Sequence, residues 1–184
     1  MKKAVFLDRD GVINEVKTER VRFVNHPNQF YFLEDVPEAI KQLNDHGYDV
    51  FVVTNQGGVG LGYMTEDALH DIHEKMVEEL NKHGAIIKEV KACTHKPYDN
   101  CPCRKPKPGM LFELMEKYNI DCSKSYMVGD RDPDIEAGIA AGLKSLMVVN
   151  THPDAYKTFK NLKEASDWII KNEEAGTQQN ERID

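Results

Sequence analysis

The sequence lacks any apolar run that approaches the ~20 residues needed to cross a bilayer. Two lysines precede an apolar segment at the N-terminus, as in an export signal, but that segment covers only Ala4 to Leu7 before charged residues follow. An apolar segment of this length is too short for a signal peptide. We therefore expect a cytoplasmic protein that has no membrane partner.

Positive charge is also scarce. The chain has 24 Lys and Arg against 31 Asp and Glu, for a formal net charge of −7. A general nucleic-acid binder would carry a basic surface instead, so we expect no nucleic-acid partner. Some positive charge gathers locally, at Lys96, Arg104, Lys105 and Lys107. This cluster is compatible either with a solvated loop or with a site for an anionic group.

Cysteine is too rare for a disulfide framework: there are four, and three of them lie close together in the sequence. Cys93-Thr-His95 is followed by Cys101-Pro-Cys103, whereas Cys122 stands apart. Three thiolates and one imidazole complete a tetrahedral shell, which is typical of structural zinc. A reactive thiol pair and a disulfide are the alternatives that the pattern leaves open.

Apolar runs alternate with segments of helical spacing along the whole chain. The predicted strands are 4–7, 49–54, 86–92, 125–129 and 144–150, and the predicted helices are 36–44, 65–83, 108–118, 133–141 and 161–171. This alternation predicts an α/β three-layer Rossmann-like fold, with a parallel sheet between helices. The length and the lack of repeats predict one domain, residues 1–171, followed by a polar tail, residues 172–184, that we expect to be frayed.

Three polar motifs directly follow predicted strands: Asp8–Asp10, Thr54–Gln56 and Gly129–Asp134. In an open parallel sheet, ligands bind at the carboxyl ends of the strands. The motifs are therefore expected to share one site.

The first motif offers a nucleophile. Asp8 and Asp10 lie two residues apart, so on an extended chain their carboxylates face the same way and Arg9 faces elsewhere. An ionised aspartate can attack phosphorus without a base, and Mg²⁺ can reduce the repulsion between the two anions. Asp10 could then give and take the proton that the reaction needs. A plain acidic turn is the alternative interpretation.

The second motif offers hydroxyl and amide groups. Thr54, Asn55 and Gln56 could hold phosphate oxygens, although a polar strand-to-loop turn is the preferred interpretation of this tripeptide taken alone. The glycine-rich segment 57–62 that follows has neither the spacing nor the Lys-Ser/Thr pair of a nucleotide-binding loop. We expect it to be a flexible loop beside the site.

The third motif offers further carboxylates. Asp130 could complete the magnesium ligands together with Asp8, and we assign Arg131 to substrate binding. Asp134 either pairs with Lys105 or Arg131 or starts the following helix. The histidines outside the cysteine cluster show no ligand or triad pattern and are expected in surface or packing roles.

Four segments together carry a resemblance to a known family. LDRDGVIN, VTNQ, CRKPKPGM and MVGDRDPD resemble, in this order, the four signature motifs of the haloacid dehalogenase superfamily of phosphatases. More narrowly, they are similar to the histidinol-phosphate and D-glycero-D-manno-heptose 1,7-bisphosphate phosphatases, which carry D-R-D-G and an inserted zinc loop. The resemblance runs from Ala4 to about Asn150, which is nearly the whole predicted domain.

The resemblance implies a role for each residue of the first and last motifs. Asp8 is the implied nucleophile and Asp10 the acid and base. The implied magnesium ligands are Asp8, Asp130 and the backbone carbonyl of Asp10.

The resemblance also implies phosphate contacts from Thr54, Asn55 and a motif lysine. We place this lysine at Lys105 rather than Lys107, because the lysine of the family directly follows the C-x-C-R run. The same family has the C-x-H…C-x-C arrangement, which implies a zinc loop at residues 93–103. Such a loop would position Arg104 and Lys105 at the phosphate.

No segment is long enough for a large cap domain, a lack that suits a monomer. The loop that contains Lys17, Arg20 and Arg22 is thus the expected lid, with surface charges as the alternative interpretation of its arginines. Its cations favour a substrate with a second phosphate over histidinol phosphate, whose own positive groups would call for acidic or aromatic partners. We therefore predict removal of the 7-phosphate of the heptose bisphosphate, a small sugar phosphate.

Three alternatives remain at this point. Histidinol phosphate is the second candidate substrate. A phosphotransferase would use the same aspartyl-phosphate with an acceptor other than water. A non-catalytic, zinc-stabilised binding module would have kept only the scaffold.

Overall fold

The computed structural model of the protein describes residues 1–181. Its strands are β1 (Ala4–Leu7), β2 (Asp49–Asn55), β3 (Glu89–Cys93), β4 (Tyr126–Gly129), β5 (Lys144–Val148) and β6 (Lys157–Phe159). Its α-helices are α1 (Val36–Asp45), α2 (Glu66–Lys82), α3 (Gly109–Tyr118), α4 (Asp132–Ala140) and α5 (Leu162–Glu181). Short 3-10 helices occur at η1 (Pro27–Gln29) and η2 (Cys122–Lys124).

The strands form one parallel sheet in the order β3-β2-β1-β4-β5-β6. The chain builds outward from β1 through β2 to β3, and then returns to place β4 on the other side of β1. The carboxyl end of β1 therefore lies at the point where the strand order reverses, which is where open parallel sheets bind ligands. The predicted Rossmann-like α/β fold is confirmed.

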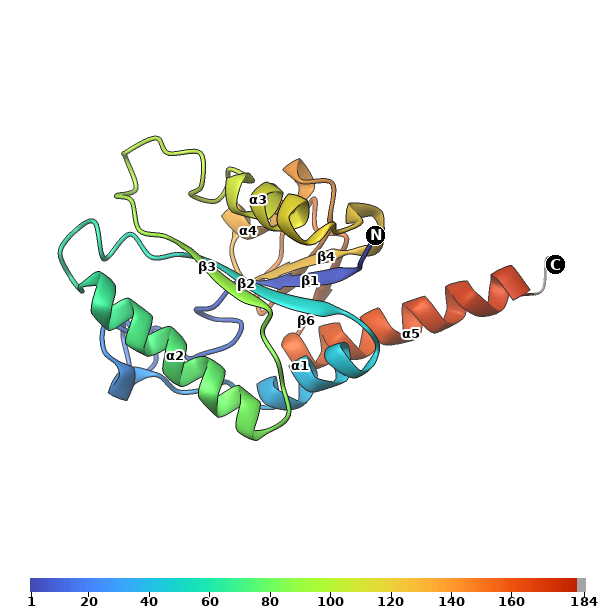
Figure 1. The fold of residues 1–184 in the computed structure, drawn as a ribbon, viewed down its shortest axis with the longest axis horizontal. Coiled ribbons are helices and arrows are strands. Elements are labelled where there is room, and N and C mark those ends of the chain that lie inside the picture. Colours follow the sequence, from blue (N-terminus) through green and yellow to red (C-terminus); the bar gives the residue numbers. More distant parts are fainter. Residues whose placement is uncertain (182–184) are drawn as a thin grey trace.

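Helices cover both faces of the sheet (Figure 1). Alternate residues of each strand point to opposite faces, so Val5 and Leu7 pack with α1, α2 and α5, while Ala4 and Phe6 pack with α3 and α4. Strands buried on both faces account for the short, continuous apolar runs in the sequence. Among residues 1–181, no helix combines the length and apolar character that crossing a membrane requires.

Helix α2 begins and packs as its sequence predicts. The Thr65 hydroxyl accepts a hydrogen bond from the Ala68 N–H at 3.1 Å, and acidic residues occupy the first turn, where they favour the positive end of the helix. Its buried side chains recur at helical spacing and fix the helix on the sheet: Leu69, Ile72, Met76 and Leu80.

The largest differences between the structure and the sequence prediction occur at three places. Strand β3 begins at Glu89 rather than at residue 86, because the Asn44 side chain bonds the backbone N–H and carbonyl of Ile86 and holds it outside the sheet. Strand β6 was missed, since two of its few residues are exposed and leave no apolar pattern. Helix α5 continues to Glu181 instead of ending near Lys171, since each added residue of a formed helix gains a hydrogen bond.

The distal part of α5 projects away from the body of the molecule (Figure 1). Its polar composition, which predicted a frayed tail, instead matches a solvent-exposed helical extension. Residues 182–184 of the predicted tail lie outside the described residues.

Candidate active site

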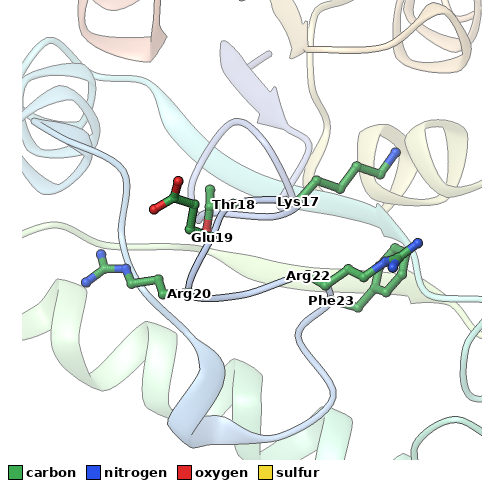
Figure 2. Close-up of a pocket in the computed structure, with 6 residues that line it drawn as sticks. All are labelled: Lys17, Thr18, Glu19, Arg20, Arg22 and Phe23. Atoms are coloured by element: carbon green, nitrogen blue, oxygen red, sulfur yellow. The ribbon is translucent and has the colours of Figure 1, made fainter.

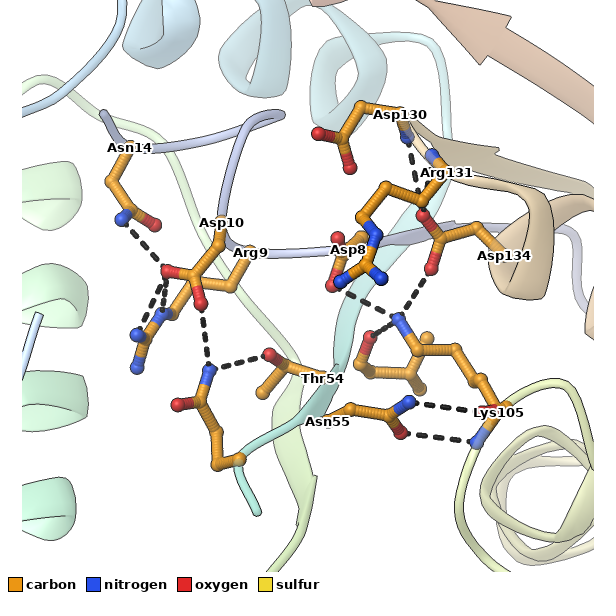
Figure 3. A network of polar contacts seen from close by, with 12 residues as sticks. Asp8, Arg9, Asp10, Asn14, Thr54, Asn55, Lys105, Asp130, Arg131 and Asp134 are labelled. Carbon is orange, nitrogen blue, oxygen red and sulfur yellow. Dashed lines mark hydrogen bonds and ion pairs between the residues drawn. The ribbon is translucent and has the colours of Figure 1, made fainter. Parts of the chain in front are cut away.

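Three carboxylates meet at the carboxyl ends of the central strands. Asp8 follows β1, Asp130 follows β4, and Asp134 lies in the first turn of α4. One ligand oxygen from each lies within 4.8 Å of the others (Figure 3). The side chain of Asp10 does not belong to this group.

Gly11 allows this close assembly. Its φ of +83° lies in the left-handed region, which residues with a Cβ seldom adopt. A Cβ at this position would also lie 2.0 Å from Oδ2 of Asp130. The glycine of the D-R-D-G motif is therefore required both by the turn and by the approach of Asp130.

Lys105 lies inside the carboxylate group. Its ammonium donates to Asp8 Oδ1 at 2.9 Å, to Asp134 Oδ1 at 2.7 Å and to the Val53 carbonyl at 2.8 Å, and its side chain is 3% exposed. Lys107 instead extends to Asn100 at the exposed side of the loop. Of the two candidate lysines, the structure brings Lys105 to the site.

The group carries excess negative charge, since one ammonium faces three carboxylates. Burial, followed by the negative charge of Asp134, raises the pKa of Asp8 well above its usual range, although the positive charge of Lys105 opposes this shift. Burial and the charge of Asp134 also raise the pKa of Asp130, to about 6. Burial disfavours the charge of Lys105, but Asp134 and Asp8 outweigh it and raise its pKa. Such a group is built to accept a further cation.

One carboxylate oxygen is left for that cation. Oδ1 of Asp130 is buried and has no hydrogen-bond partner within residues 1–181. A buried acceptor without a partner is costly, and a metal ion bound by carboxylate oxygens would satisfy it. Asp8 and Asp130 thus fit the magnesium ligands that the sequence predicts.

Asp134 fills both of the roles that the sequence left open. Its Oδ1 accepts from Lys105, while its Oδ2 accepts from the backbone N–H groups of Asp130 and Arg131 at 3.2 and 3.1 Å. It therefore starts α4 and holds the lysine at the same time. Arg131 itself is exposed at the rim.

Asp10 is held apart from the three carboxylates, by hydrogen bonds from three side chains. Its Oδ1 accepts from Arg9 Nε and Nη2 at 3.1 and 2.9 Å and from Asn14 at 3.0 Å, and its Oδ2 accepts from Gln56 at 3.2 Å (Figure 3). Burial alone would raise the pKa of Asp10, but the Arg9 charge and these hydrogen bonds outweigh it and lower that pKa.

The prediction that Arg9 faces away from Asp10 is wrong. Its side chain is completely buried and curls back onto the Asp10 carboxylate, because a buried guanidinium requires acceptors for its N–H groups. Its Nη1 contacts Nε2 of His73 at 3.0 Å. Sequence reasoning placed His73 in a surface or packing role, although its spacing of four from Leu69 and three from Met76 put it beside the buried stripe of α2.

This location makes His73 sensitive to acid. Burial and then Arg9, with a smaller effect of His70, lower its pKa to about 3, while Asp10 opposes the shift. The unfolded chain binds a proton near pH 6.5, and the folded protein does not. The contribution of His73 to the free energy of unfolding is therefore fully present above pH 6.5 and is lost as the pH falls towards 3. At pH 5.0 the loss amounts to about 2 kcal/mol.

Urea unfolding at pH 7.5 and 5.0 tests this. Between the two pH values, His73→Gln should lose about 2 kcal/mol less stability than the wild type, because glutamine does not titrate. His70→Gln on the exposed face of the same helix should behave as the wild type does. Equal losses in wild type and His73→Gln would contradict the shifted pKa.

The Thr54–Gln56 segment holds other residues of the site in place through hydrogen bonds. Asn55 exchanges two 3.0 Å hydrogen bonds with the backbone N–H and carbonyl of Lys105, and Gln56 donates to Thr54 Oγ1 at 2.8 Å as well as to Asp10. The amide of Asn55 is thus occupied in holding the lysine backbone. Arg104, next in the chain to Lys105, has a buried Nη1 without a hydrogen-bond partner in the described part of the chain.

The predicted zinc ligands also come together. One atom each of Cys93, His95, Cys101 and Cys103 lies within 4.8 Å of the others, and nearest contacts include 3.1 Å between Cys93 and Cys103 Sγ and 3.2 Å between His95 Nδ1 and Cys103 Sγ. Within residues 1–181 all four cysteines are free thiols. Burial and the neighbouring thiols raise the pKa of Cys103 to about 12, so a bound cation would be needed to hold all three as thiolates.

The glycine-rich loop lies on the backbone of this cluster. Gly60 donates its N–H to the Thr94 carbonyl at 3.0 Å, and a Cβ on Gly60 would lie 2.7 Å from that carbonyl oxygen. The glycine therefore permits close packing of the two loops. The cluster connects β3 to the segment that delivers Arg104 and Lys105.

The expected lid is a turn closed by hydrogen bonds between Lys17 and Arg22 and between Thr18 and Val21. It borders a pocket of about 550 Å³ lined by Lys17, Thr18, Glu19, Arg20, Arg22 and Phe23. Figure 2 shows Arg20 pointing away from Lys17 and Arg22. Arg20 is paired with Glu15 at 2.7 and 3.0 Å and lies 3.9 Å from the Tyr31 ring centroid.

The fold and the aspartate site define a hydrolase of the haloacid dehalogenase class. The family model described as HAD-hydrolase-like matches residues 102–172. A D-glycero-β-D-manno-heptose-1,7-bisphosphate 7-phosphatase of Helicobacter pylori is 34% identical over 91% of this chain and 97% of its own. One of Haemophilus ducreyi is 40% identical over 82% of this chain and 84% of its own.

A solved structure agrees. The D,D-heptose 1,7-bisphosphate phosphatase of B. bronchiseptica, complexed with magnesium and phosphate, matches with a TM-score of 0.85 and 29% identity, over 94% of this chain and 99% of that chain. The chain belongs to the family of D-glycero-D-manno-heptose-1,7-bisphosphate 7-phosphatases within the haloacid dehalogenase class. The resemblance read from the four motifs is confirmed.

Proposed function

We propose that the protein is a magnesium-dependent phosphatase that removes the 7-phosphate of D-glycero-D-manno-heptose 1,7-bisphosphate through an aspartyl-phosphate. The main structural support for this proposal is the group of carboxylates around the buried Lys105 at the end of β1, which consists of Asp8, Asp130 and Asp134. The names of the relatives support the substrate.

Asp8 and Asp130, with the Asp10 backbone carbonyl, would hold the magnesium ion. When bound, it would neutralise charge on the carboxylates and on the phosphoryl group. The magnesium and phosphate in the B. bronchiseptica structure support this assignment. Lys105 supplies the fixed positive charge on the other side of Asp8.

In the first step, the Asp8 carboxylate forms a bond to phosphorus while the bond to the ester oxygen breaks. The leaving oxygen takes a proton from Asp10. Asp10 has a lowered pKa in the resting protein, and a phosphate anion beside it favours its protonated form. In the second step, Asp10 takes a proton from water, the water oxygen attacks phosphorus, and Asp8 leaves as inorganic phosphate is released.

We further propose that Cys93, His95, Cys101 and Cys103 hold a structural zinc ion. A set of three sulfurs and one nitrogen leaves no open position for catalysis. The role of the metal would be to shape the loop so that Arg104 and Lys105 reach the site. The Asn55 side chain fixes the other side of this segment through the Lys105 backbone.

The positive charges of the lid favour a substrate with a second phosphate, and we assign different roles to its three cationic side chains. Arg20 is occupied by Glu15 and Tyr31, so we assign it to support of the loop. Lys17 and Arg22 line the pocket and have no ion-pair partner in the described residues, so we assign them to the distal phosphate. Arg131 and Arg104 remain candidates for contacts nearer the reacting phosphate.

Comparison of kcat/KM for the heptose bisphosphate and for histidinol phosphate tests the substrate. We expect a preference for the bisphosphate, and Lys17→Ala should raise its KM about tenfold, since one charge-assisted contact is lost. Arg20→Ala serves as the matched lid variant and should change KM less than Lys17→Ala. A preference for histidinol phosphate would overturn the substrate proposal and leave the phosphatase proposal intact.

The proposal also covers the domain organisation, the cellular compartment and the oligomeric state. A single domain, residues 1–171, is supported by one continuous sheet with helices packed on both faces. The four cysteines form no disulfide within residues 1–181, which favours a reducing compartment such as the cytoplasm. The lack of a large cap domain within residues 1–181 suits a monomer.

A further inference from the structure

We propose that His73 is a positioning residue for the acid–base aspartate: by accepting a hydrogen bond from Arg9, it fixes the guanidinium that holds Asp10 in place. This inference rests on the proposed function, since it concerns the same Asp10. His73 does not touch Asp8 or its cluster, and acts only through Arg9.

The first support is the burial of Arg9. It is the largest of the fully buried side chains, at 0% exposure, although it carries five N–H donors and a permanent charge. Nε and Nη2 are directed to Asp10 and Nη1 to His73, so the two acceptors lie on different edges of the planar guanidinium. Two such acceptors determine the orientation of the whole plane.

The second support is that His73 must be an acceptor here. An arginine can only donate, so the 3.0 Å contact requires a lone pair on Nε2 and places the imidazole proton on Nδ1. The lowered pKa of His73 agrees with a neutral ring at neutral pH. A protonated ring would repel the guanidinium and lose the contact.

The third support is the rigidity of the element that carries His73. Helix α2 is anchored on the sheet by Leu69, Ile72, Met76 and Leu80, all buried. His73 thus links the loop after β1 to a fixed helix 64 residues further along the chain. Asn14 restrains Asp10 from its own loop, and Gln56 restrains it from the residue directly after β2. The pair of Arg9 and His73 adds the restraint from α2.

Loss of this restraint should affect proton transfer more than binding. A general acid contributes about 10²–10⁴ in rate, and only when correctly placed against the leaving oxygen. For the heptose bisphosphate, whose alkoxide needs a proton to leave, His73→Leu should lower kcat/KM about tenfold or more. This parameter covers the reaction up to formation of the aspartyl-phosphate, which is the step in which Asp10 acts as the acid. For p-nitrophenyl phosphate, whose phenolate leaves without protonation, kcat/KM should fall less than about threefold. The kcat value is not used for this comparison, because Asp10 also acts as the base in the second step, which both substrates share.

Two polar variants separate positioning from packing. His73→Gln places an amide oxygen near the position of Nε2 and should restore most of the kcat/KM for the heptose bisphosphate. His73→Asn is one methylene shorter, cannot reach Arg9, and should behave as His73→Leu does. His70→Gln, on the exposed face of α2, is the control and should match the wild type on both substrates.

Steady-state kinetics of these four variants and the wild type, with both substrates and excess magnesium, decide the matter. Equal losses in kcat/KM on both substrates, or an Asn variant as active as the Gln variant, would overturn the positioning role. Should His73→Leu fail to fold, the Gln and Asn pair carries the same comparison. A wild type inactive on both substrates would refute the proposed phosphatase function itself, whereas an active wild type with unaffected His73 variants would refute only this inference.

Discussion

Asp8→Asn should reduce kcat at least a thousandfold, a loss of about 4 kcal/mol in transition-state stabilisation. The amide cannot form an acyl phosphate by attack on phosphorus, yet its oxygen can still accept the hydrogen bond from Lys105 at the position of Oδ1. The substitution also removes the negative charge of one of three neighbouring carboxylates, so we expect no loss of thermal stability. Phosphate release and a thermal melt of the same preparation measure both effects.

Asp132→Asn is the matched control for this change. Asp132 lies between Asp130 and Asp134 in the sequence but is exposed, outside the carboxylate group. Its replacement should leave kcat within about twofold of the wild type, because a surface charge near a helix start contributes only a few tenths of a kcal/mol. An Asp8→Asn protein within tenfold of wild-type turnover would remove Asp8 as the nucleophile.

The second large effect concerns the cysteine cluster. Structural zinc contributes on the order of 10 kcal/mol of apparent binding energy coupled to folding. Cys103→Ser should therefore lose the metal and lower the melting temperature by about 10 °C or more, since 1 kcal/mol corresponds to roughly 2–4 °C in a domain of this size. Activity should fall as well, because Arg104 and Lys105 directly follow Cys103.

Cys122→Ser is the control, since Cys122 lies outside the cluster and is exposed. Elemental analysis should find one zinc per chain in the wild type and in Cys122→Ser, and substantially less in Cys103→Ser. If active wild-type protein contains no zinc, or if both variants melt at the same temperature, the structural zinc site is refuted.

Local patterns in the sequence determined much of the fold and the site. The apolar runs predicted β1, β2 and β4, and the positions of Asp8 and Asp130 followed, because residues that end parallel strands meet at one edge of a sheet. The cysteine spacing brought the four candidate zinc ligands into one loop, since residues a few positions apart cannot separate far. Each of these inferences depends on near neighbours in the chain.

Only the tertiary structure decided the contacts between distant residues. The family resemblance favoured Lys105 over Lys107, but only the fold shows that the chain carries Lys105 to Asp8, 97 residues earlier, and leaves Lys107 at the surface. The contact between Arg9 and His73 likewise joins residues 64 positions apart. Which buried polar groups become partners depends on how helices and loops pack, because each buried donor must find its acceptor in three dimensions.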